Sequence, residues 1–255
     1  MKYENCTMPC QPEIDRTVDS RWWHGAMDFL LPPRCVLCGS SATRSCLCEA
    51  CKSDLPWIAS QCLQCGLPLS TKNDEICGQC IGKTPPFTRT LTALKYQFPA
   101  DRLVQSFKFS RQLVAGRILS RIMCERAIRT GIDLPGAIIP IPLHRRRLVE
   151  RGFNQAFELG ADISRQLNVP LLATALRRRR NTKAQSGLNR KQRRQNLSAA
   201  FYWVGATKPC RHVALVDDVM TTGTTVTECA RVLKTAGAKR VDVWVAARAT
   251  RANER

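Results

Sequence analysis

The sequence has no apolar run near the ~18 residues that a membrane-spanning helix needs, which argues against membrane insertion. It also lacks a basic start followed by an apolar middle, the pattern of a secretory signal peptide. Aromatic residues make up only 6% of the chain, and 20 Asp and Glu stand against 40 Lys and Arg. We therefore expect a soluble, cytoplasmic protein with no membrane insertion and with anionic partners.

The positive charge is unevenly distributed along the chain. Residues 1–98 contain 10 Lys and Arg against 9 Asp and Glu, whereas residues 99–255 contain 30 against 11. A polyanion is therefore expected to meet the second part. Residues 1–20 are polar and without periodicity, which predicts disorder, and residues 21–31 predict a short amphipathic helix that stops at Pro32-Pro33.

Cysteine, in contrast, is abundant at 14 residues, and in a reducing compartment this favours metal over disulfides. Four C-x2-C pairs follow one another at gaps of nine, ten and eleven residues. Each pair forms one knuckle, and two knuckles complete a tetrahedral shell for zinc. The sequence predicts two zinc ions in two ribbons, one held by Cys35, Cys38, Cys48 and Cys51 and the other by Cys62, Cys65, Cys77 and Cys80.

Several alternatives to this assignment stay open from the cysteine pattern alone. The first pair can combine with the third and the second with the fourth, the eight thiolates can hold iron–sulfur clusters, or the cysteines can be incidental. Cys46 can also replace Cys48 as a ligand. With all eight thiolates used, no coordination position stays open, so the predicted zinc is structural.

From residue 90 onwards, short apolar stretches alternate with helical periodicity. The predicted strands are residues 91–98, 137–142, 212–216 and 240–247, and the predicted helices are residues 100–110, 113–129, 153–167 and 225–236. Strands that alternate with helices indicate an α/β fold, a mainly parallel sheet with helices on both faces.

Residues 213–225, VALVDDVMTTGTT, are the most informative stretch of the chain. A buried strand is predicted to end at Asp217 and Asp218, where a hydroxyl- and Gly-rich loop opens a helix. Ligands of open α/β sheets bind at the carboxyl ends of strands, and a helix N-terminus suits a phosphate. Both carboxylates can accept hydrogen bonds from vicinal sugar hydroxyls. The alternative is an ordinary Asp-rich turn.

This stretch resembles the signature of type I phosphoribosyltransferases at every one of its thirteen positions. The resemblance implies a site for 5-phosphoribosyl diphosphate with Mg2+, in which the acidic pair binds the ribose hydroxyls and the loop binds the 5′-phosphate. It assigns Asp217 and Asp218 as catalytic residues. The implied substrate-binding residues are Asp217, Asp218, Val219, Met220, Thr221, Thr222, Gly223, Thr224 and Thr225.

A second predicted ligand loop follows the strand at Ile139. Pro140 and Pro142 make a rigid strand exit, and the guanidinium groups after it suit a diphosphate. The loop resembles the diphosphate loop of the amidotransferase branch of the same superfamily, but no glutaminase-type nucleophile is found at the N-terminus. The further substrate-binding residues predicted here are His144, Arg145, Arg146, Arg147, Arg151 and Gln155.

Residues 177–195 hold nine Lys and Arg and no acidic residue. Like charges repel, so we expect this basic segment to be mobile without an anion. It lies where type I enzymes carry a flexible hood over the sugar diphosphate; the alternative is a solvated basic stretch. The predicted nucleic-acid-binding residues are Arg177, Arg178, Arg179, Arg180, Lys183, Arg190, Lys191, Arg193 and Arg194.

Together, the cysteine module, PIPLHRRRLVERGFNQA, RRNTKAQSGLNRKQRRQN and the signature loop resemble the ComF family, which includes GntX-like proteins, over about residues 30–247. Residues 1–20 and Cys46 depart from the family pattern. The resemblance implies a role in natural competence, in uptake of transforming DNA or in use of DNA as a nutrient. The implied partners are 5-phosphoribosyl diphosphate, single-stranded DNA, and a DNA-uptake helicase or DNA-processing proteins.

The fold expected from this resemblance is a type I phosphoribosyltransferase-like parallel sheet, preceded by a small double zinc-ribbon module with four cysteines in each ribbon. The expected domains are an N-terminal extension (1–31), the double zinc ribbon (32–84) and the phosphoribosyltransferase-like domain (88–250). Two functions stay open: a DNA-uptake protein that binds the sugar diphosphate and single-stranded DNA, or an active phosphoribosyltransferase with an unidentified small-molecule acceptor.

Overall fold

The computed structural model describes residues 33–42, 45–70, 75–109, 112–179, 200–205 and 208–250. Of Arg145 and Arg146 it describes the backbone alone. Residues 1–20, the predicted helix over residues 21–31 and residues 180–195 of the basic segment lie outside these ranges. Within the described part of the chain, no helix combines the length and the apolar character needed to cross a membrane.

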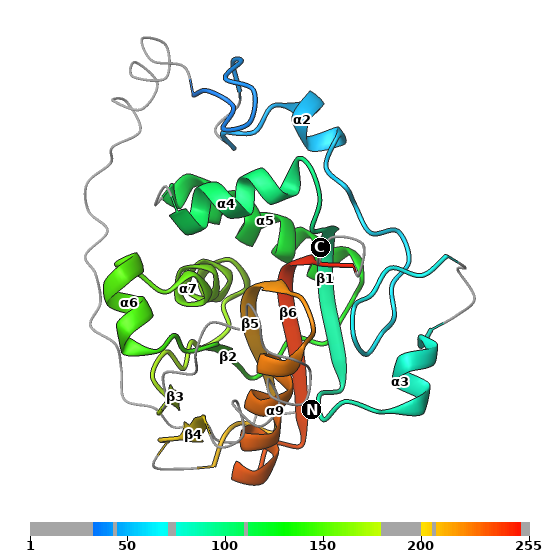
Figure 1. The fold of residues 1–255 in the computed structure, drawn as a ribbon, viewed down its shortest axis with the longest axis vertical. Coiled ribbons are helices and arrows are strands. Elements are labelled where there is room, and N and C mark those ends of the chain that lie inside the picture. Colours follow the sequence, from blue (N-terminus) through cyan, green and yellow to red (C-terminus); the bar gives the residue numbers. More distant parts are fainter. Residues whose placement is uncertain are drawn as a thin grey trace.

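A four-stranded sheet with the order β1-β6-β5-β2 forms the centre of the molecule (Figure 1). Every pairing in it is parallel. The strands are β1 (Arg89–Lys95), β2 (Ala137–Pro140), β5 (His212–Met220) and β6 (Arg240–Arg248). Their near-continuous burial matches a parallel sheet that is covered on both faces, so the predicted α/β class is confirmed.

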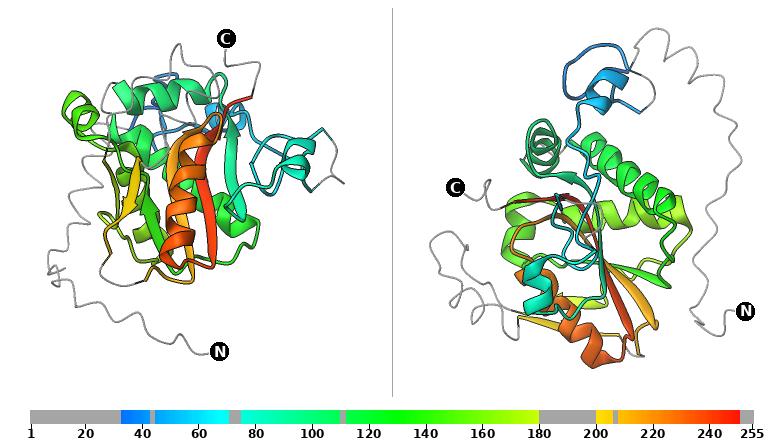
Figure 2. Two further views of the ribbon diagram at one scale, coloured as in Figure 1. Left: turned by 60° about the horizontal axis from the view of Figure 1, so that its bottom comes forward. Right: turned by 90° about the vertical axis from the view of Figure 1, so that its right-hand side faces the viewer.

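Two layers cover the two faces of this sheet (Figure 2). On one face lie α4 (Ala100–Phe109), α5 (Leu113–Arg129) and α7 (Gln155–Leu167). On the other lie α9 (Thr224–Ala236) and an antiparallel hairpin of β3 (Leu176–Arg178) and β4 (Phe201–Trp203). Successive strand residues point to opposite layers: Val216 and Trp244 pack in the first layer, and Leu215 and Val243 pack in the second.

Three elements differ from the sequence-based expectation. β5 continues through the acidic pair to Met220 instead of ending at Val216. The stretch Arg145–Arg151, predicted as part of a loop, forms the helix α6. The start of the basic segment forms β3, so its first residues pair with β4 instead of forming a mobile stretch.

The cysteine-rich part of the chain covers the edge strand β1. It contains the short helices α2 (Glu49–Ser53) and α3 (Gly78–Gly82). Between them, the Ile58 N–H donates to the Ala93 carbonyl at 3.0 Å, and the Lys95 N–H donates to the Pro56 carbonyl at 2.9 Å. Unpaired groups on an edge strand invite pairing with other chains. The cysteine-rich part therefore supplies the hydrogen bonds that this edge of the sheet needs.

Candidate functional site

The site begins where β5 turns into α9 through residues 221–225, called the threonine loop below. Gly223 has φ +73° at the N-cap of α9, and a Cβ atom there would lie 2.8 Å from the Met220 Cε. Glycine adopts this left-handed conformation without the steric cost that other residues meet. The loop carries exposed hydroxyls, and those of Thr222 and Thr224 lie 2.8 Å apart. A helix N-terminus with such donors suits an anion.

Two adjacent carboxylates lie shortly before this loop, near the end of β5. Asp218 is 6% exposed, and its Oδ2 pairs with the Nζ of Lys108 at 2.8 Å. Its Oδ1 accepts a hydrogen bond from the Val219 N–H at 2.7 Å. Burial and the neighbouring charge of Asp218 raise the pKa of Asp217 to about 7. One of the two carboxyl groups therefore titrates near neutral pH, as at many ligand sites.

Lys108 reaches the acidic pair from α4, more than a hundred residues earlier in the chain. Phe107, the residue before it, is fully buried and fills the space over Gly116 of α5, where a Cβ atom would lie 2.5 Å from the ring. The Phe107 ring also packs against Phe153 at a centroid distance of 5.6 Å. This packing fixes the end of α4, and with it the lysine.

A hollow of about 170 Å3 opens beside the acidic pair, and we call it the carboxyl-end hollow. Its polar lining places four cationic side chains around two carboxylates. Pockets for drug-sized ligands have volumes of about 300–1,000 Å3, so this hollow fits one polar fragment of a larger anion. The lining residues are Lys108, Ile141, Pro142, Leu143, Arg147, Arg151, Asn154, Gln155, Ala156, Arg178, Asp217, Asp218 and Thr225.

The arginines of this hollow come from two separate elements. Arg147 and Arg151 belong to α6, and Arg178 belongs to β3. Burial, together with the nearby charge of Arg147, lowers the pKa of Arg178. The Arg178 guanidinium also lies over the Phe201 ring at 5.4 Å. Cations held so close together repel one another, and a bound anion relieves that repulsion.

Gln155 contributes a buried amide to the same hollow. It is 3% exposed, and its Oε1 accepts a hydrogen bond from the Arg151 Nη1 at 3.2 Å. Its Nε2 is buried without a hydrogen-bond partner among the described residues. A buried donor without a partner costs about 1–3 kcal/mol, which a ligand acceptor can recover. The preceding Asn154 caps α7 through the Ala156 N–H at 3.1 Å.

The predicted substrate-binding residues fall into two groups in the structure. The members that line the carboxyl-end hollow are Arg147, Arg151, Gln155, Asp217, Asp218 and Thr225. Outside its lining lie His144, Val219, Met220, Thr221, Thr222, Gly223 and Thr224, while the side chains of Arg145 and Arg146 lie outside the described atoms.

Sequence reasoning missed Lys108 and Asn154, and it named Arg178 only among the nucleic-acid contacts, within the segment that resembles the hood. No local pattern marks Lys108, whereas the N-cap preference of asparagine could have drawn attention to Asn154. The other predicted nucleic-acid-binding residues that are described, Arg177 and Arg179, are exposed. Arg180, Lys183, Arg190, Lys191, Arg193 and Arg194 lie outside the described residues.

Two clusters of four cysteines form the candidate metal centres. The first ribbon brings together Cys35, Cys38, Cys48 and Cys51, and the second ribbon brings together Cys62, Cys65, Cys77 and Cys80; within each cluster the sulfur atoms lie within 4.8 Å of one another. This is the predicted sequential pairing, not the cross-braced one. Hydrogen bonds from Ser40 lower the pKa of Cys38 to about 6. Four thiolates at this spacing fit a tetrahedral zinc ion.

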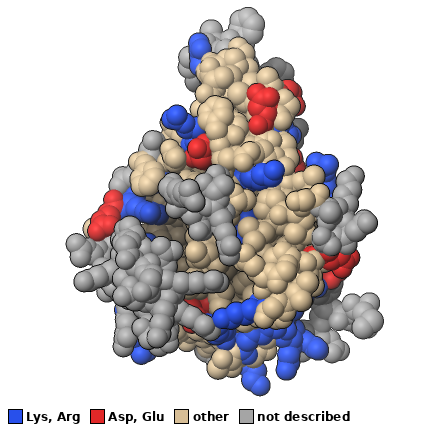
Figure 3. Space-filling view, turned by 45° about the vertical axis from the view of Figure 1, so that its right-hand side comes forward, with Lys and Arg blue, Asp and Glu red and all other residues tan. Residues whose placement is uncertain are grey.

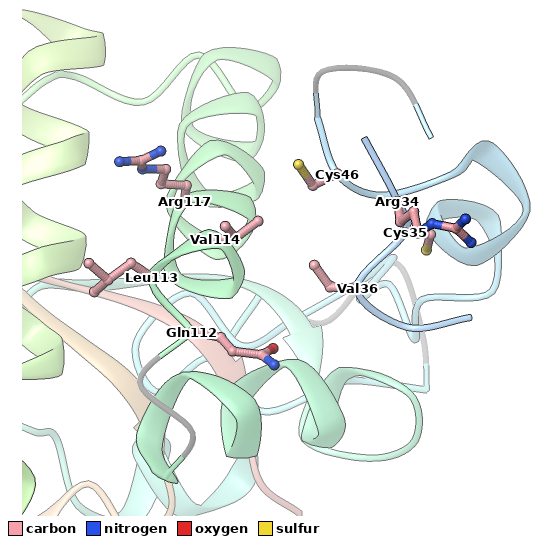
Figure 4. A pocket seen from close by; sticks show the side chains of 8 residues that line it. All are labelled: Arg34, Cys35, Val36, Cys46, Gln112, Leu113, Val114 and Arg117. Atoms are coloured by element: carbon pink, nitrogen blue, oxygen red, sulfur yellow. The ribbon is translucent and has the colours of Figure 1, made fainter. Parts of the chain in front are cut away.

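Cys46 takes no part in the first cluster. It lies instead beside a larger hollow of about 580 Å3, between the first ribbon and the start of α5 (Figure 4). Val36 and Val114 contribute apolar surface there, and Arg34 and Arg117 contribute the charges. This larger hollow has no carboxylate in its lining, so the carboxyl-end hollow is the better candidate site on chemical grounds.

Comparison with known proteins agrees with both parts of this structure. Residues 26–81 match the model of the double zinc ribbon domain, and residues 154–255 match that of the phosphoribosyl transferase domain. Competence protein F of Haemophilus influenzae is 37% identical over 224 residues, which cover 85% of this chain and 97% of that protein. The chain belongs to the competence protein F family.

The family extends to proteins of other bacteria. DNA utilization protein YhgH of Escherichia coli (strain K12) is 37% identical over 202 residues, 78% of this chain and 88% of that protein. Among solved structures, a purine phosphoribosyltransferase from Pyrococcus horikoshii Ot3 is 17% identical over 52% of this chain and 82% of that chain, with a TM-score of 0.31. The family resemblance predicted from the sequence is thus confirmed by the sequence relatives.

Proposed function

We propose that this protein binds 5-phosphoribosyl diphosphate with Mg2+ at the carboxyl ends of its strands and takes part in the uptake or utilisation of DNA as a single-strand-binding protein. The observation that carries the ligand assignment is the pair Asp217 and Asp218 beside clustered cations, shortly before the threonine loop. Few ligands other than a phosphorylated sugar combine vicinal hydroxyls for a carboxylate pair with phosphates for cations and a helix N-terminus.

Each part of the ligand has a natural partner in this arrangement. The ribose hydroxyls donate hydrogen bonds to Asp217 and Asp218, and the 5′-phosphate accepts them from the threonine loop. The diphosphate lies among Arg147, Arg151 and Arg178, with Gln155 as a further donor. Mg2+ prefers oxygen ligands and neutralises part of the diphosphate charge when bound.

Calorimetry on the zinc-loaded full chain tests the ligand assignment. The titrants are 5-phosphoribosyl diphosphate with and without Mg2+, ribose 5-phosphate and inorganic diphosphate. We expect the intact sugar diphosphate with Mg2+ to bind most tightly, since it alone engages the acidic pair, the threonine loop and the arginines together. Absence of binding, or diphosphate binding as tightly as the whole ligand, would overturn the assignment.

The DNA half of the proposal is supported by the relatives and by charge. Proteins of the family are named for competence and for DNA utilization. The net charge of +20 belongs almost wholly to residues 99–255. On either side of Arg178, the side chains of Arg177 and Arg179 are exposed, and the Arg179 guanidinium lies over the Tyr202 ring at 4.9 Å. Cations beside an aromatic ring suit the phosphates and bases of a single strand.

A second basic region provides a matched control for the DNA assignment. Lys and Arg gather at the lower edge of the face shown in Figure 3. The two lysines chosen for the control, Lys208 and Lys239, are exposed and lie in the loops that lead into β5 and β6. Binding of a single-stranded oligonucleotide should weaken with salt by a log–log slope of about −0.7 per phosphate contacted. Replacing Arg177 and Arg179 by Ala should flatten that slope by up to about 1.4.

The same exchange at Lys208 and Lys239 should leave the slope nearly unchanged. The reverse pattern, a flattened slope for the lysine variant alone, would move the DNA contact to the loops before β5 and β6. Because Arg178 lines the carboxyl-end hollow between two predicted DNA contacts, the sugar diphosphate should also compete with the oligonucleotide. Undiminished DNA binding at saturating ligand would separate the two functions.

Catalytic phosphoribosyl transfer is the second candidate function. The raised pKa of Asp217, about 7, favours it, since a carboxyl group that titrates near neutral pH can exchange protons during a reaction. In such a transfer the amine or base acceptor would form a bond to the sugar carbon that loses diphosphate, the acceptor proton would be released, and the acidic pair would stabilise the positively charged sugar. Release of diphosphate that requires both Mg2+ and an added amine or base acceptor, and that is lost in Asp217→Asn, would establish turnover.

A further inference from the structure

Arg248, the last residue of β6, joins the threonine loop to the second ribbon. The side chain is almost fully buried, with the residue 5% exposed. Its Nη1 donates to the carbonyls of Met220, at 2.8 Å, and of Thr221, where the threonine loop begins. Its Nε donates to the carbonyl of Cys65 at 2.9 Å. One planar guanidinium thus holds two segments that lie far apart in the sequence.

The Cys65 carbonyl belongs to a knuckle that carries two of the four metal-binding thiols. Within it, the Gly66 N–H donates to the Cys62 carbonyl at 2.9 Å, and Gly66 has φ +68°. The knuckle is pressed against β1: the Thr90 N–H donates to the Leu63 carbonyl at 2.8 Å, and a Cβ atom on Gly66 would lie 2.8 Å from the Thr90 Cγ2. The knuckle therefore lies between β1 and Arg248.

The threonine loop depends on the same arginine from the other side. The Ala249 N–H, next to Arg248, donates to the Met220 carbonyl at 3.1 Å, and Arg248 Nη1 also donates to the Ala249 carbonyl at 2.7 Å. A buried guanidinium that loses a hydrogen-bond acceptor costs free energy. If the Cys65 carbonyl moves away, the guanidinium therefore changes its hydrogen bonds to the Met220 and Thr221 carbonyls. That change acts directly on the residues that begin the threonine loop.

We propose that Arg248 is a positioning residue through which metal in the second ribbon and a phosphorylated sugar at the threonine loop stabilise one another. Structural zinc supplies the energy that orders its knuckles. With the knuckle ordered, the Cys65 carbonyl holds the guanidinium, and the guanidinium holds the loop in its binding conformation. Coupling between two sites is reciprocal, so the ligand must also strengthen metal retention. This inference rests on the proposed function, because it concerns the same site.

The first ribbon supplies an internal control. It has the same four-cysteine arrangement, but a Cβ atom on its Gly39 would meet nothing within 4 Å. The first ribbon contacts the layer of α4, α5 and α7, on the opposite face of the sheet from α9. Lys52 pairs with Glu125 of α5 at 3.5 Å, and Leu55 packs in the core of that layer. Metal in the first ribbon is therefore expected to leave the threonine loop unaffected.

The test combines zinc release to a chelator with calorimetry, on the full zinc-loaded chain. Saturating 5-phosphoribosyl diphosphate should slow the release of one of the two zinc ions by about tenfold and leave the other unchanged, within the range of typical couplings. Cys77→Ser, which disables the second ribbon, should lower affinity for the sugar diphosphate by a similar factor. Cys48→Ser, which disables the first, should change it by less than about twofold.

Substitutions of two arginines on β6 then test whether Arg248 couples the second ribbon to the threonine loop. Arg248→Lys keeps the charge but loses the fork, so it should speed zinc release from the second ribbon even without ligand and weaken ligand binding. Arg240→Lys, at the other end of the same strand, should do neither. The circular dichroism spectrum of Arg248→Lys should match that of the wild type, which would show that its weaker ligand binding is not caused by unfolding.

The outcomes separate this inference from the proposed function. If the wild type binds the sugar diphosphate but both ribbon variants lose affinity equally, or neither does, the inference is wrong and the proposed function stands. If the wild type binds no ligand, the proposed function fails, and the coupling to the ligand fails with it. Equal zinc release from Arg248→Lys and Arg240→Lys without ligand would overturn the role of Arg248.

Discussion

Both ends of the parallel sheet carry buried or half-buried aspartates and arginines, but these groups are paired with one another to different degrees at the two ends. At the amino ends, Asp242 is 2% exposed and accepts hydrogen bonds from the His212 Nε2 at 2.9 Å and from the Arg240 Nη2 at 3.0 Å. Arg240 also donates to Asp133 at 2.8 Å. Burial is compensated there, because the aspartate has two hydrogen-bonding neighbours that can carry positive charge.

At the carboxyl ends, several buried charged and polar groups are not fully matched by opposite charges or hydrogen bonds. The pKa of Asp217 is raised, that of Arg178 is lowered, and the Nε2 of Gln155 has no partner among the described residues. Groups in this state destabilise the folded protein and are retained where a ligand completes them. We therefore expect the amino ends to serve stability, and the proposed function assigns ligand binding to the carboxyl ends.

Exchange of both carboxylates at the carboxyl ends should have the largest effect on binding. Asp217→Asn combined with Asp218→Asn removes two charge-assisted hydrogen-bond acceptors for the ribose, each contributing about 1.5–3 kcal/mol. Binding of the sugar diphosphate should therefore fall by at least about 100-fold in calorimetry, with the fold retained. Unchanged affinity in this double variant would remove the distinction between the two ends.

The opposite pattern is expected at the amino ends. Asp242→Ala leaves the half-buried Arg240 and His212 without their shared acceptor, and breaking a buried pair costs about 3–5 kcal/mol. Urea unfolding should show this loss of stability, while the folded fraction keeps its affinity for the sugar diphosphate. A variant that stays stable but binds the sugar diphosphate more weakly would mean that the hydrogen bonds of Asp242 influence the carboxyl-end hollow.

Stability as a function of pH distinguishes the two ends further. The pKa of Asp217 is about 7 in the folded protein, against 3.8 for an ordinary aspartate, so folding favours its protonated form. The resulting destabilisation grows as pH rises from about 4 to about 7. Asp217→Asn should therefore be more stable than the wild type by up to about 4 kcal/mol at pH 8, and by up to about 2 kcal/mol at pH 5. A variant less stable than the wild type at pH 8 would contradict the raised pKa.

The smallest expected effect concerns the amide of Gln155. Gln155→Leu removes a buried group whose Nε2 lacks a partner among the described residues, so the ligand-free protein should be no less stable in thermal unfolding. Binding of the sugar diphosphate should weaken by about tenfold, the value of one hydrogen bond. A stable variant with full affinity would show that the amide does not meet the ligand.

Long periodic elements could be predicted from the sequence, and short charged ones could not. The predicted helix over residues 113–129 coincides with α5, because its apolar residues repeat at the helical period. α6 and β3 are short and rich in arginine, so no apolar period marks them. Both take their conformation from tertiary packing.

Residues of the candidate site could be named from the sequence where they are consecutive, and could not where they converge only in space. The acidic pair and the threonine loop form one continuous stretch, whereas Lys108 meets Asp218 from a distant helix. The basic segment was treated as one uniform charged run. Strand alternation at β3 instead directs Arg178 to the carboxyl-end hollow and leaves Arg177 and Arg179 exposed.

A crystal structure of the full chain with 5-phosphoribosyl diphosphate and Mg2+ tests the central claim most directly. The account predicts ribose hydroxyls within hydrogen-bond distance of the Asp217 and Asp218 carboxylates. It also predicts the 5′-phosphate at the threonine loop, and the diphosphate beside Arg147, Arg151 or Arg178. Ligand bound at the amino ends of the strands, or a carboxyl-end hollow left empty at saturating ligand, would contradict it.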